Sequence, residues 1–544
     1  MGAAGLALAA VLVVCVVAPP EIRGAGQAAV AAFVALAVAG SAARAAGSAA
    51  TRWVFAALPV ALVAIRMALA PGEAIEPAAC LLLGACAGIA AAHADEHGAL
   101  FAWLFGALVT LVGGHALYET FFGLAAAAAR VRASVPAGAM AAVLNRLEQG
   151  RPYAGFLTPA ALGCFLIMTV PPVVAWALGK RGGARAFGLG AASLGAAGLV
   201  ATRSVSALVA LAAALGLASL RGRVAPRVLA IAAGAIGLAV VGAGIARSDS
   251  VFAPTRGDSP SRLRAGNVRI ALEIVRDHPL VGVGPGGYAE AFPQYRRPGD
   301  NESRHAHDLP AELAAEWGVP VGLLLSALFF WMFVGPVVLR TGEARTLTSG
   351  LAIGLAAFAL HNLVDFTAFL PSLLVFAAVS RGLLAQRVGS SSSSASARAA
   401  WIALAIAIAA VAAGAGLSRD ALFDARGAAA SGDHAGALGF GARAERLAPW
   451  DADPPQLSAE ARMALGAAEP GAVLDDADRA VDRAPARAAA RVARARARTV
   501  AGDVPGAYAD LAEAARLYPL RPEYAEQRDA VAASLAKAGE QVPR

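Results

Sequence analysis

The residues best suited to chemistry lie close together, between Ser261 and Gly322. The first part of this stretch, SRLRAGNVRIALEIVRD, places Arg264 and Arg269 on a predicted helix. Arginine side chains bind phosphate oxygens through two parallel hydrogen bonds, so this helix could hold a diphosphate. A solvated helix whose arginines pair with neighbouring carboxylates, such as Glu273, explains the same pattern, and the charges alone favour it.

Two histidines lie in the sequence HAHD, just before a run that begins LPAELAAEWGVPVG. The ordinary pKa of histidine lies near neutral pH, which suits His307 to act as a general base at a membrane boundary. Glu312 or Glu316 would orient this histidine or cap the helix that follows. A zinc site is the alternative, but His305 and His307 have no third histidine or cysteine close by, so we expect no metal.

A glycine-rich segment, VGVGPGGY at residues 281–288, lies between these two parts. Its backbone N–H groups could bind an anion. A tight turn near the membrane surface explains the same composition, and no strand–turn–helix pattern of a dinucleotide fold surrounds the segment. Both interpretations stay open from the sequence.

Two further polar positions interrupt apolar runs elsewhere in the chain. Arg203 lies between two such runs. His361 and Asp365 are four residues apart in the sequence HNLVDF, which places them on one face of a predicted helix. Ionisable side chains at membrane depth mark functional sites by default, and the alternative is a structural ion pair.

The composition places all these residues in a membrane protein. Hydrophobic residues make up 58% of the 544 residues, charged residues only 15%, and the mean hydropathy is +0.60. Soluble proteins carry roughly 25% charged residues. Several apolar runs reach the length that crosses a bilayer, so we predict an all-α polytopic bundle of about 12–13 spans. The net charge of +8 reflects basic loops that set orientation, and we expect no nucleic-acid partner.

The distribution of basic residues between the apolar runs predicts the orientation. Short loops such as the one with Lys180, Arg181 and Arg185 would face the cytoplasm. The N-terminus would then lie inside, and the central polar segment and the tail outside. The predicted parts are an N-terminal transmembrane bundle, a large outer loop, C-terminal spans and a helical tail, at residues 1–245, 246–314, 315–417 and 418–544.

The tail contains an internal repeat. Glycines recur at intervals of 34 and 36 residues and prolines at intervals of 36 and 34, at Gly432, Gly466, Gly502, Pro449, Pro485 and Pro519. Paired helices with this period are typical of tetratricopeptide-like solenoids, which bind protein partners. A plain alanine-rich helical tail is the alternative.

The central stretch resembles a known family. RLRAGNVRIALEIVRDHPLVGVGPGGY followed by HAHDLPAELAAEWGVPVG is similar to the motifs of O-antigen ligase and O-antigen polymerase-like membrane proteins. By this resemblance Arg264 takes the family's arginine and His307 its histidine. Asp308 replaces the usual asparagine, and Val268 stands where the family often has tryptophan. HNLVDFTAFLPS, residues 361–372, is similar to a further family segment.

The resemblance extends over about residues 50–386 and implies a function. Members are metal-independent glycosyltransferases of the C-type architecture in the bacterial inner membrane, with no cofactor. They take a glycan from undecaprenyl diphosphate on the periplasmic face and pass it to a glycan or lipid acceptor. The implied catalytic residues are His307, Arg264 and Glu312; the diphosphate would bind to Arg203, Arg264 and Arg269; support would come from His305, Asp308, Glu316, His361 and Asp365.

Two other classes of function remain open. A secondary transporter of a small anion such as bicarbonate would use intramembrane charges such as Arg66, His115 and Asp365. The large polar outer segment and the lack of inverted repeats count against it. A non-catalytic scaffold that acts through its tail is the other alternative.

Overall fold

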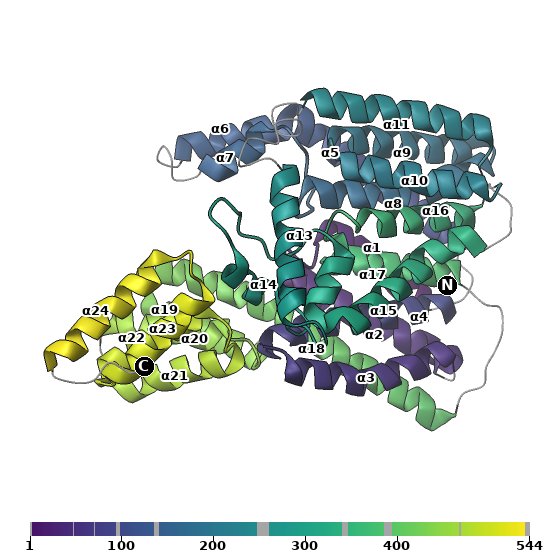
Figure 1. Ribbon diagram of the computed structural model, residues 1–544. Helices are drawn as coiled ribbons and strands as arrows, with labels where there is room; N and C mark the ends of the chain where they lie inside the picture. Colours follow the sequence, from purple (N-terminus) through teal and green to yellow (C-terminus); the bar gives the residue numbers. More distant parts are fainter. Residues whose placement is uncertain are drawn as a thin grey trace.

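A computed structural model describes residues 3–46, 48–69, 71–93, 98–134, 141–222, 224–246, 260–339, 346–385, 394–466 and 469–538, and all regular secondary structure in these ranges is helical. Figure 1 shows a bundle of roughly aligned helices with a smaller helical tail at one end. The predicted all-α membrane architecture is confirmed. Within the predicted outer loop, residues 247–259 lie outside the described ranges.

Apolar helices form the bundle. Its first half contains α1 (Ala3–Val17), α2 (Gly24–Ala45), α3 (Ala49–Met67), α4 (Pro71–His93), α5 (Gly98–Tyr118), α8 (Pro159–Leu178), α9 (Gly182–Ala201), α10 (Val205–Leu220) and α11 (Pro226–Ala246). Its second half contains α15 (Leu309–Leu339), α16 (Leu347–His361), α17 (Pro371–Leu384) and α18 (Ala395–Ala430). Within the described ranges, eight helices are long and apolar enough to cross a membrane, and four shorter helices are apolar. The protein is an integral membrane protein.

Small residues let the helices of the bundle approach closely. A Cβ atom at Gly354 of α16 would lie 2.2 Å from the carbonyl oxygen of Met168 in α8. A Cβ atom at Gly113 of α5 would lie 2.6 Å from the carbonyl oxygen of Leu194 in α9. Such backbone-to-backbone contacts replace the hydrophobic effect as the main source of packing energy between helices in lipid. They determine how α8 and α16 are placed, and both helices lead toward the candidate site.

Helix α15 is broken, and the glycine-rich segment fills the break. Gly318 has φ 74° and ψ 164°, so the carbonyl groups of the preceding turn lose their helical partners. The N–H of Val283 donates to the carbonyl of Ala315 at 3.0 Å, and that of Gly284 donates to the carbonyl of Glu316 at 2.8 Å. These two N–H groups therefore act inside the protein, as expected of a tight turn.

The tail is a series of antiparallel helices that follows the far end of α18. They are α19 (His434–Leu447), α20 (Asp453–Leu465), α21 (Pro470–Arg483), α22 (Ala488–Ala501), α23 (Val504–Leu517) and α24 (Pro522–Ala538). Gly432, Gly466 and Gly502 adopt left-handed φ angles of 83°, 67° and 85° in alternate turns. The repeat of glycine and proline thus corresponds to alternating turns between helices. The tetratricopeptide assignment itself stays a prediction.

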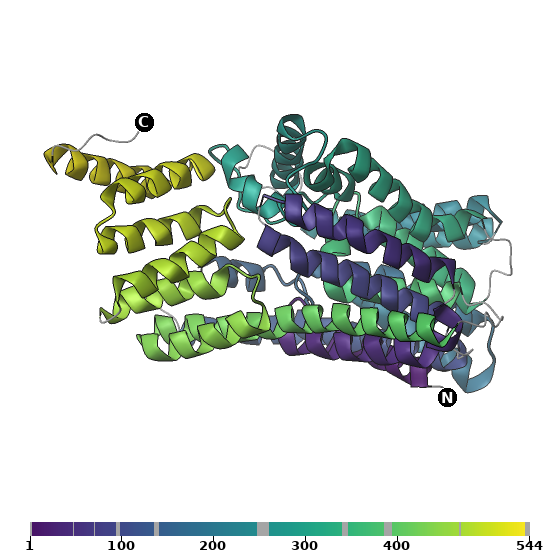
Figure 2. The ribbon, with the colours of Figure 1, turned by 90° about the horizontal axis from the view of Figure 1, so that it is seen from below.

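The polar parts of the molecule gather at one end of the bundle. Figure 1 shows the tail at the same end as α13 (Pro260–Asp277) and as the hairpin of α6 (Leu124–Ser134) and α7 (Ala141–Glu148), with the N-terminus at the opposite end. Figure 2 shows α18 running through the bundle and out into the tail. Which end faces the outside of the cell stays a prediction.

Candidate functional site

Three side chains from three segments of the chain, those of Arg264, His307 and His361, surround the carboxylate of Asp365. We call these four residues the central cluster. Nη2 of Arg264 lies 3.2 Å from Oδ2 of Asp365. Nδ1 of His307 lies 3.7 Å from Oδ1, and Nε2 of His361 lies 4.0 Å from Oδ2. The side chains of His361 and Asp365 are 0% and 1% exposed, whereas those of Arg264 and His307 are 38% and 22% exposed. The cluster is therefore open on the side of Arg264 and His307.

Asp365 is held in its charged form. Burial by itself raises the pKa of this carboxyl, but the nearby His307, His361 and Arg264 lower it more, so that the net pKa lies below its ordinary value. A buried carboxylate remains stable only when cations or N–H groups surround it. The backbone N–H of Phe366 also donates to Oδ1 at 2.9 Å. Asp365 can therefore orient Arg264 and His307 at once.

His307 has an unusual backbone conformation. Its φ is 58°, in the left-handed region that non-glycine residues rarely adopt. Its Nδ1 atom is buried and has no hydrogen-bond partner, since the distance of 3.7 Å to Asp365 exceeds that of a hydrogen bond. Catalytic hydrogen bonds are often long before substrate binds. The ring meets that of Phe366 edge-on, with centroids 4.7 Å apart. Because Nδ1 is the nitrogen that faces Asp365, Nε2 is the ring nitrogen left for a substrate.

Glu312 orients the other histidine. Its Oε1 lies 2.7 Å from Nδ1 of His305, and its Oε2 accepts a hydrogen bond from the N–H of Ala306 at 2.8 Å. The ring of His305 stacks on that of Phe366, with centroids 4.6 Å apart. The expected carboxylate partner of His307 was Glu312 or Glu316, whereas the structure places Asp365 beside it.

Two other expected residues have structural contacts. Oε1 of Glu316 accepts a hydrogen bond from the N–H of Tyr288 at 3.4 Å, under the glycine-rich turn. Oδ1 of Asp308 accepts a hydrogen bond from the N–H of Ala311 at 2.9 Å, at the start of α15. Burial raises the pKa of Asp308. Glu316 therefore supports the glycine-rich turn, and Asp308 supports the start of the helix that follows the two histidines.

A chain of hydroxyl groups joins the central cluster to α10. Nε2 of His361 lies 3.2 Å from Oγ of Ser206, which lies 3.2 Å from Oγ of Ser204. Nδ1 of His361 lies 3.3 Å from Oγ1 of Thr367. Arg203 therefore lies next to the end of this chain. Sequence reasoning missed Ser206, although its spacing of two from Ser204 at the start of an apolar run was visible.

Backbone strain gathers at the same place. Among the described residues, the non-glycine positions with positive φ are Ala154 (45°), Arg203 (50°) and His307 (58°). The N–H groups of Tyr153 and Ala154 donate to Oε2 of Glu119 at 2.6 and 2.7 Å. Strain of this kind persists where the surroundings enforce it, and it clusters at functional sites.

The segment around Ala154 is also tied to Arg203. Nε of Arg151 donates to the carbonyl of Thr202 at 2.8 Å, and Nη1 of Arg203 donates to the carbonyl of Gln149 at 3.1 Å. Glu119 thus holds a segment that in turn holds Arg203. Sequence reasoning missed Glu119 and Arg151, because neither residue lies in a recognisable motif.

Arg269 lies away from the central cluster. Its Nη1 donates to Glu273 at 2.9 Å and its Nη2 to Asp300 at 2.5 Å. Nη2 of Arg297 also donates to Glu273, at 2.5 Å. These ion pairs attach the segment after the glycine-rich turn to α13, so the contacts of Arg269 are those of a residue that supports the site.

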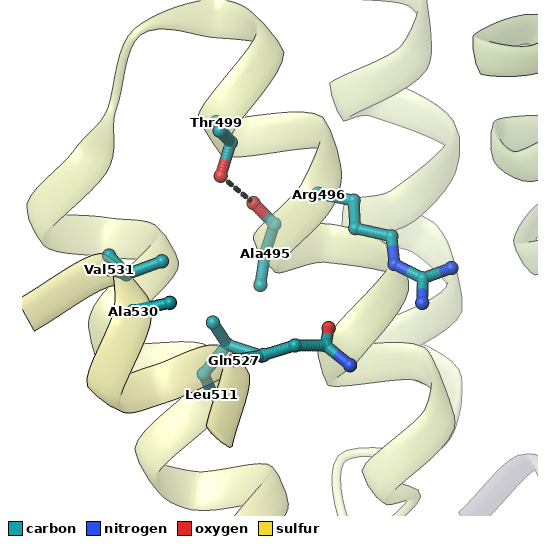
Figure 3. A pocket seen from close by; sticks show the side chains of 7 residues that line it. All are labelled: Ala495, Arg496, Thr499, Leu511, Gln527, Ala530 and Val531. Carbon is teal, nitrogen blue, oxygen red and sulfur yellow. Dashed lines mark hydrogen bonds between the residues drawn. The ribbon is translucent and has the colours of Figure 1, made fainter. Parts of the chain in front are cut away.

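The described residues contain no group of three His, Cys, Asp or Glu side chains that could hold a metal ion. A pocket of about 220 Å³ lies in the tail, between α22, α23 and α24 (Figure 3). This volume is below the roughly 300–1,000 Å³ of typical ligand sites. Its lining is mostly apolar: Ala495, Arg496, Thr499, Leu511, Gln527, Ala530 and Val531.

Comparison with known proteins identifies the region that holds most of these residues. Residues 190–326 match the O-antigen ligase family. The match contains Arg203, Arg264, His305 and His307, and Asp365 lies beyond its end. No curated protein matches the chain. This membrane protein therefore contains a domain of the O-antigen ligase family, at residues 190–326.

Proposed function

We propose that the protein transfers a glycan from undecaprenyl diphosphate to an acceptor hydroxyl, at the periplasmic face of the bacterial inner membrane. The family domain supports glycan transfer in the biosynthesis of surface polysaccharide. The observation that carries the proposal is the pairing of Arg264 and His307 around Asp365. An arginine such as Arg264 can bind phosphate oxygens and a histidine such as His307 can accept a proton, and such a transfer requires both tasks.

The donor diphosphate would bind to Arg264 and Arg203. Nη2 of Arg264 contacts Asp365, and a guanidinium group carries five N–H donors, so further donors can bind phosphate oxygens. The bond between the anomeric carbon and the phosphate oxygen breaks with its electrons on that oxygen. Preorganised cations stabilise such a leaving charge. Arg269 would act indirectly, by holding the segment that leads to the histidines.

The acceptor would approach His307. Its Nε2 atom takes the proton of the acceptor hydroxyl while the oxygen forms its bond to the anomeric carbon. Asp365, at the other edge of the ring, stabilises the imidazolium that results. Glu312 holds His305 against Phe366 and so shapes the turn from which His307 projects. The proposed step needs no cofactor.

A deletion strain tests this function. We expect His307→Ala and Arg264→Ala proteins, expressed at the level of the wild type in the membrane, to leave the strain without full-length surface polysaccharide. Undecaprenyl-linked glycan should accumulate, because its consumption stops. Full-length polysaccharide with either variant would refute the assigned roles. Altered uptake of a small anion without accumulated glycan would indicate a transporter instead.

A further inference from the structure

The tail contacts a segment of the candidate site that we call the approach loop, residues 288–304, which ends next to His305. One contact centres on Arg487, at the start of α22. Its guanidinium binds Glu73 of α4, Asp453 of α20 and Glu290 of the approach loop, the last at 3.3 Å. Three separate parts of the molecule therefore meet at one cation.

A second contact lies farther along the approach loop, at Tyr518 after α23. The hydroxyl of Tyr518 donates to Glu302 and accepts a hydrogen bond from Nη1 of Arg296 at 2.6 Å. Arg296 also lies 3.2 Å from Glu302. The guanidinium of Arg521 lies 5.3 Å from the centroid of the Tyr518 ring, where a cation is attracted to an aromatic face.

The opposite side of the approach loop rests on α13, through the ion pairs of Arg269 with Asp300 and of Arg297 with Glu273. The loop is thus held between α13 and the tail. Figures 1 and 2 agree that the tail lies at the end of the bundle where α13 and α14 (Tyr288–Ala291) lie. Any shift of the tail would therefore move the chain just before His305.

The Arg487 contact is well shielded. Its side chain is only 14% exposed, and those of Glu73 and Glu290 are 19% and 17% exposed. Ion pairs on the surface contribute little, whereas breaking a shielded pair leaves an uncompensated charge in a poor solvent. The surrounding carboxylates raise the pKa of Arg487 despite its burial. A tail that swings freely would have to break this contact.

We propose that the tail stays docked on the approach loop and holds this loop in position at the candidate site, with Arg487 and Tyr518 as positioning residues. The docking of the tail does not depend on the proposed function; only the expected effect on kcat rests on it. A loosened approach loop would misplace His307, so kcat should fall. The KM for the lipid-linked donor should not change, because Arg203 and Arg264 lie outside the loop.

The first test replaces one hydroxyl group. Tyr518→Phe removes the hydrogen bonds to Glu302 and Arg296 and keeps the ring. Hydrogen–deuterium exchange of residues 292–304, in the full-length protein in lipid nanodiscs, should accelerate about tenfold, the factor that corresponds to 1.4 kcal/mol. Tyr524→Phe is the matched control, because that hydroxyl contacts Arg521 within the tail and not the loop. Its exchange at residues 292–304 should match the wild type.

The second test removes the central cation. Arg487→Met should also accelerate exchange in the approach loop and lower kcat. Arg494→Met is its control, since Arg494 pairs with Asp510 and Asp478 inside the tail. This control weakens contacts within the tail and leaves the contacts with the approach loop intact. It therefore distinguishes an effect of lost docking from an effect of lower tail stability.

The outcomes distinguish this inference from the proposed function. If hydrogen–deuterium exchange of residues 292–304 is unchanged in Tyr518→Phe and Arg487→Met, the docking of the tail on the approach loop is refuted, even if glycan transfer is demonstrated. Faster exchange with an unchanged kcat would refute the positioning role. If the wild type transfers no glycan but the two variants still loosen the loop, the proposed function fails and the docking of the tail is supported.

Discussion

Asp365 connects the two kinds of chemistry in the candidate site at the scale of single residues. It lies next to Arg264 and to His307, whereas Glu312 pairs with His305. A buried carboxylate beside a histidine fixes which ring nitrogen carries the proton and stabilises the imidazolium. The sequence marked Asp365 as a supporting residue and Glu312 as a catalytic one; in the proposed mechanism their tasks are exchanged.

Replacement of Asp365 tests whether Asp365, and not Glu312, supports His307. Asp365→Asn keeps the shape of the side chain and removes its charge, so His307 loses the group that stabilises its protonated form. We expect kcat to fall about a hundredfold or more, the usual range for a general base. Glu312→Gln should have a smaller effect, because Glu312 acts on His305. Initial transfer rates with purified protein and lipid-linked donor give kcat for both variants. An equal fall in kcat in the two variants would contradict the role assigned to Asp365.

At the scale of elements, the end of α5 sets the position of Arg203. Helix α5 continues into one turn of π-helix, η1 (Glu119–Gly123), a rare feature that occurs mostly at functional sites. The first residue of this turn, Glu119, accepts hydrogen bonds from the N–H groups of Tyr153 and Ala154. Successive N–H groups of this kind form an anion-binding concavity, and here a carboxylate of the protein itself occupies it.

Loss of Glu119 should therefore weaken donor binding. Glu119→Ala leaves two N–H groups without their charged acceptor, and hydrogen bonds to charged groups contribute roughly 1.5–3 kcal/mol. We expect the KM for the donor to rise about tenfold or more, with a smaller rise for Glu119→Gln, which keeps an acceptor oxygen. Glu148→Gln is a control, because Glu148 pairs with Arg132 in the hairpin. A fall in kcat with an unchanged donor KM would argue against this role.

At the scale of the whole molecule, the bundle and the tail meet in a region rich in carboxylates. A Cβ atom at Gly72 in α4 would lie 2.3 Å from the carbonyl oxygen of Trp450, so the two parts are in close contact. The next residue, Asp451, is partly buried, and this partial burial and the charge of Asp453 raise its pKa to about 6. The joint between bundle and tail therefore contains a group that titrates near neutral pH.

The stability of the tail should depend on this group. Unfolded aspartate has a pKa of about 3.9, so the contribution of Asp451 is fully present below about pH 4 and is lost as the pH rises through 6. Asp451→Asn should raise the thermal midpoint of the full-length protein at pH 7.5, by the equivalent of about 3 kcal/mol, and by about a third as much at pH 4.5. Asp529→Asn, an exposed tail residue, serves as control. An equal shift at both pH values would contradict this prediction.

The sequence by itself determined the class of the protein, because class depends on local properties. Apolar runs of bilayer length predicted membrane helices, and the spacing of glycine and proline in the tail predicted a repeat of paired helices. The stretch around Arg264 and His307 stood out because its polar residues interrupt apolar sequence. The family resemblance of that stretch agrees with the match at residues 190–326.

The tertiary structure alone decided which side chains meet. Asp365 lies 58 residues after His307 in the chain, and the two segments meet where the N–H of Leu309 donates to the carbonyl of Asn362 at 2.9 Å. The left-handed angles at Ala154, Arg203 and His307, and the contact of the tail with the approach loop, likewise depend on long-range packing. No local pattern encodes such pairings, because the free energy that selects them comes from contacts between helices that are distant in sequence.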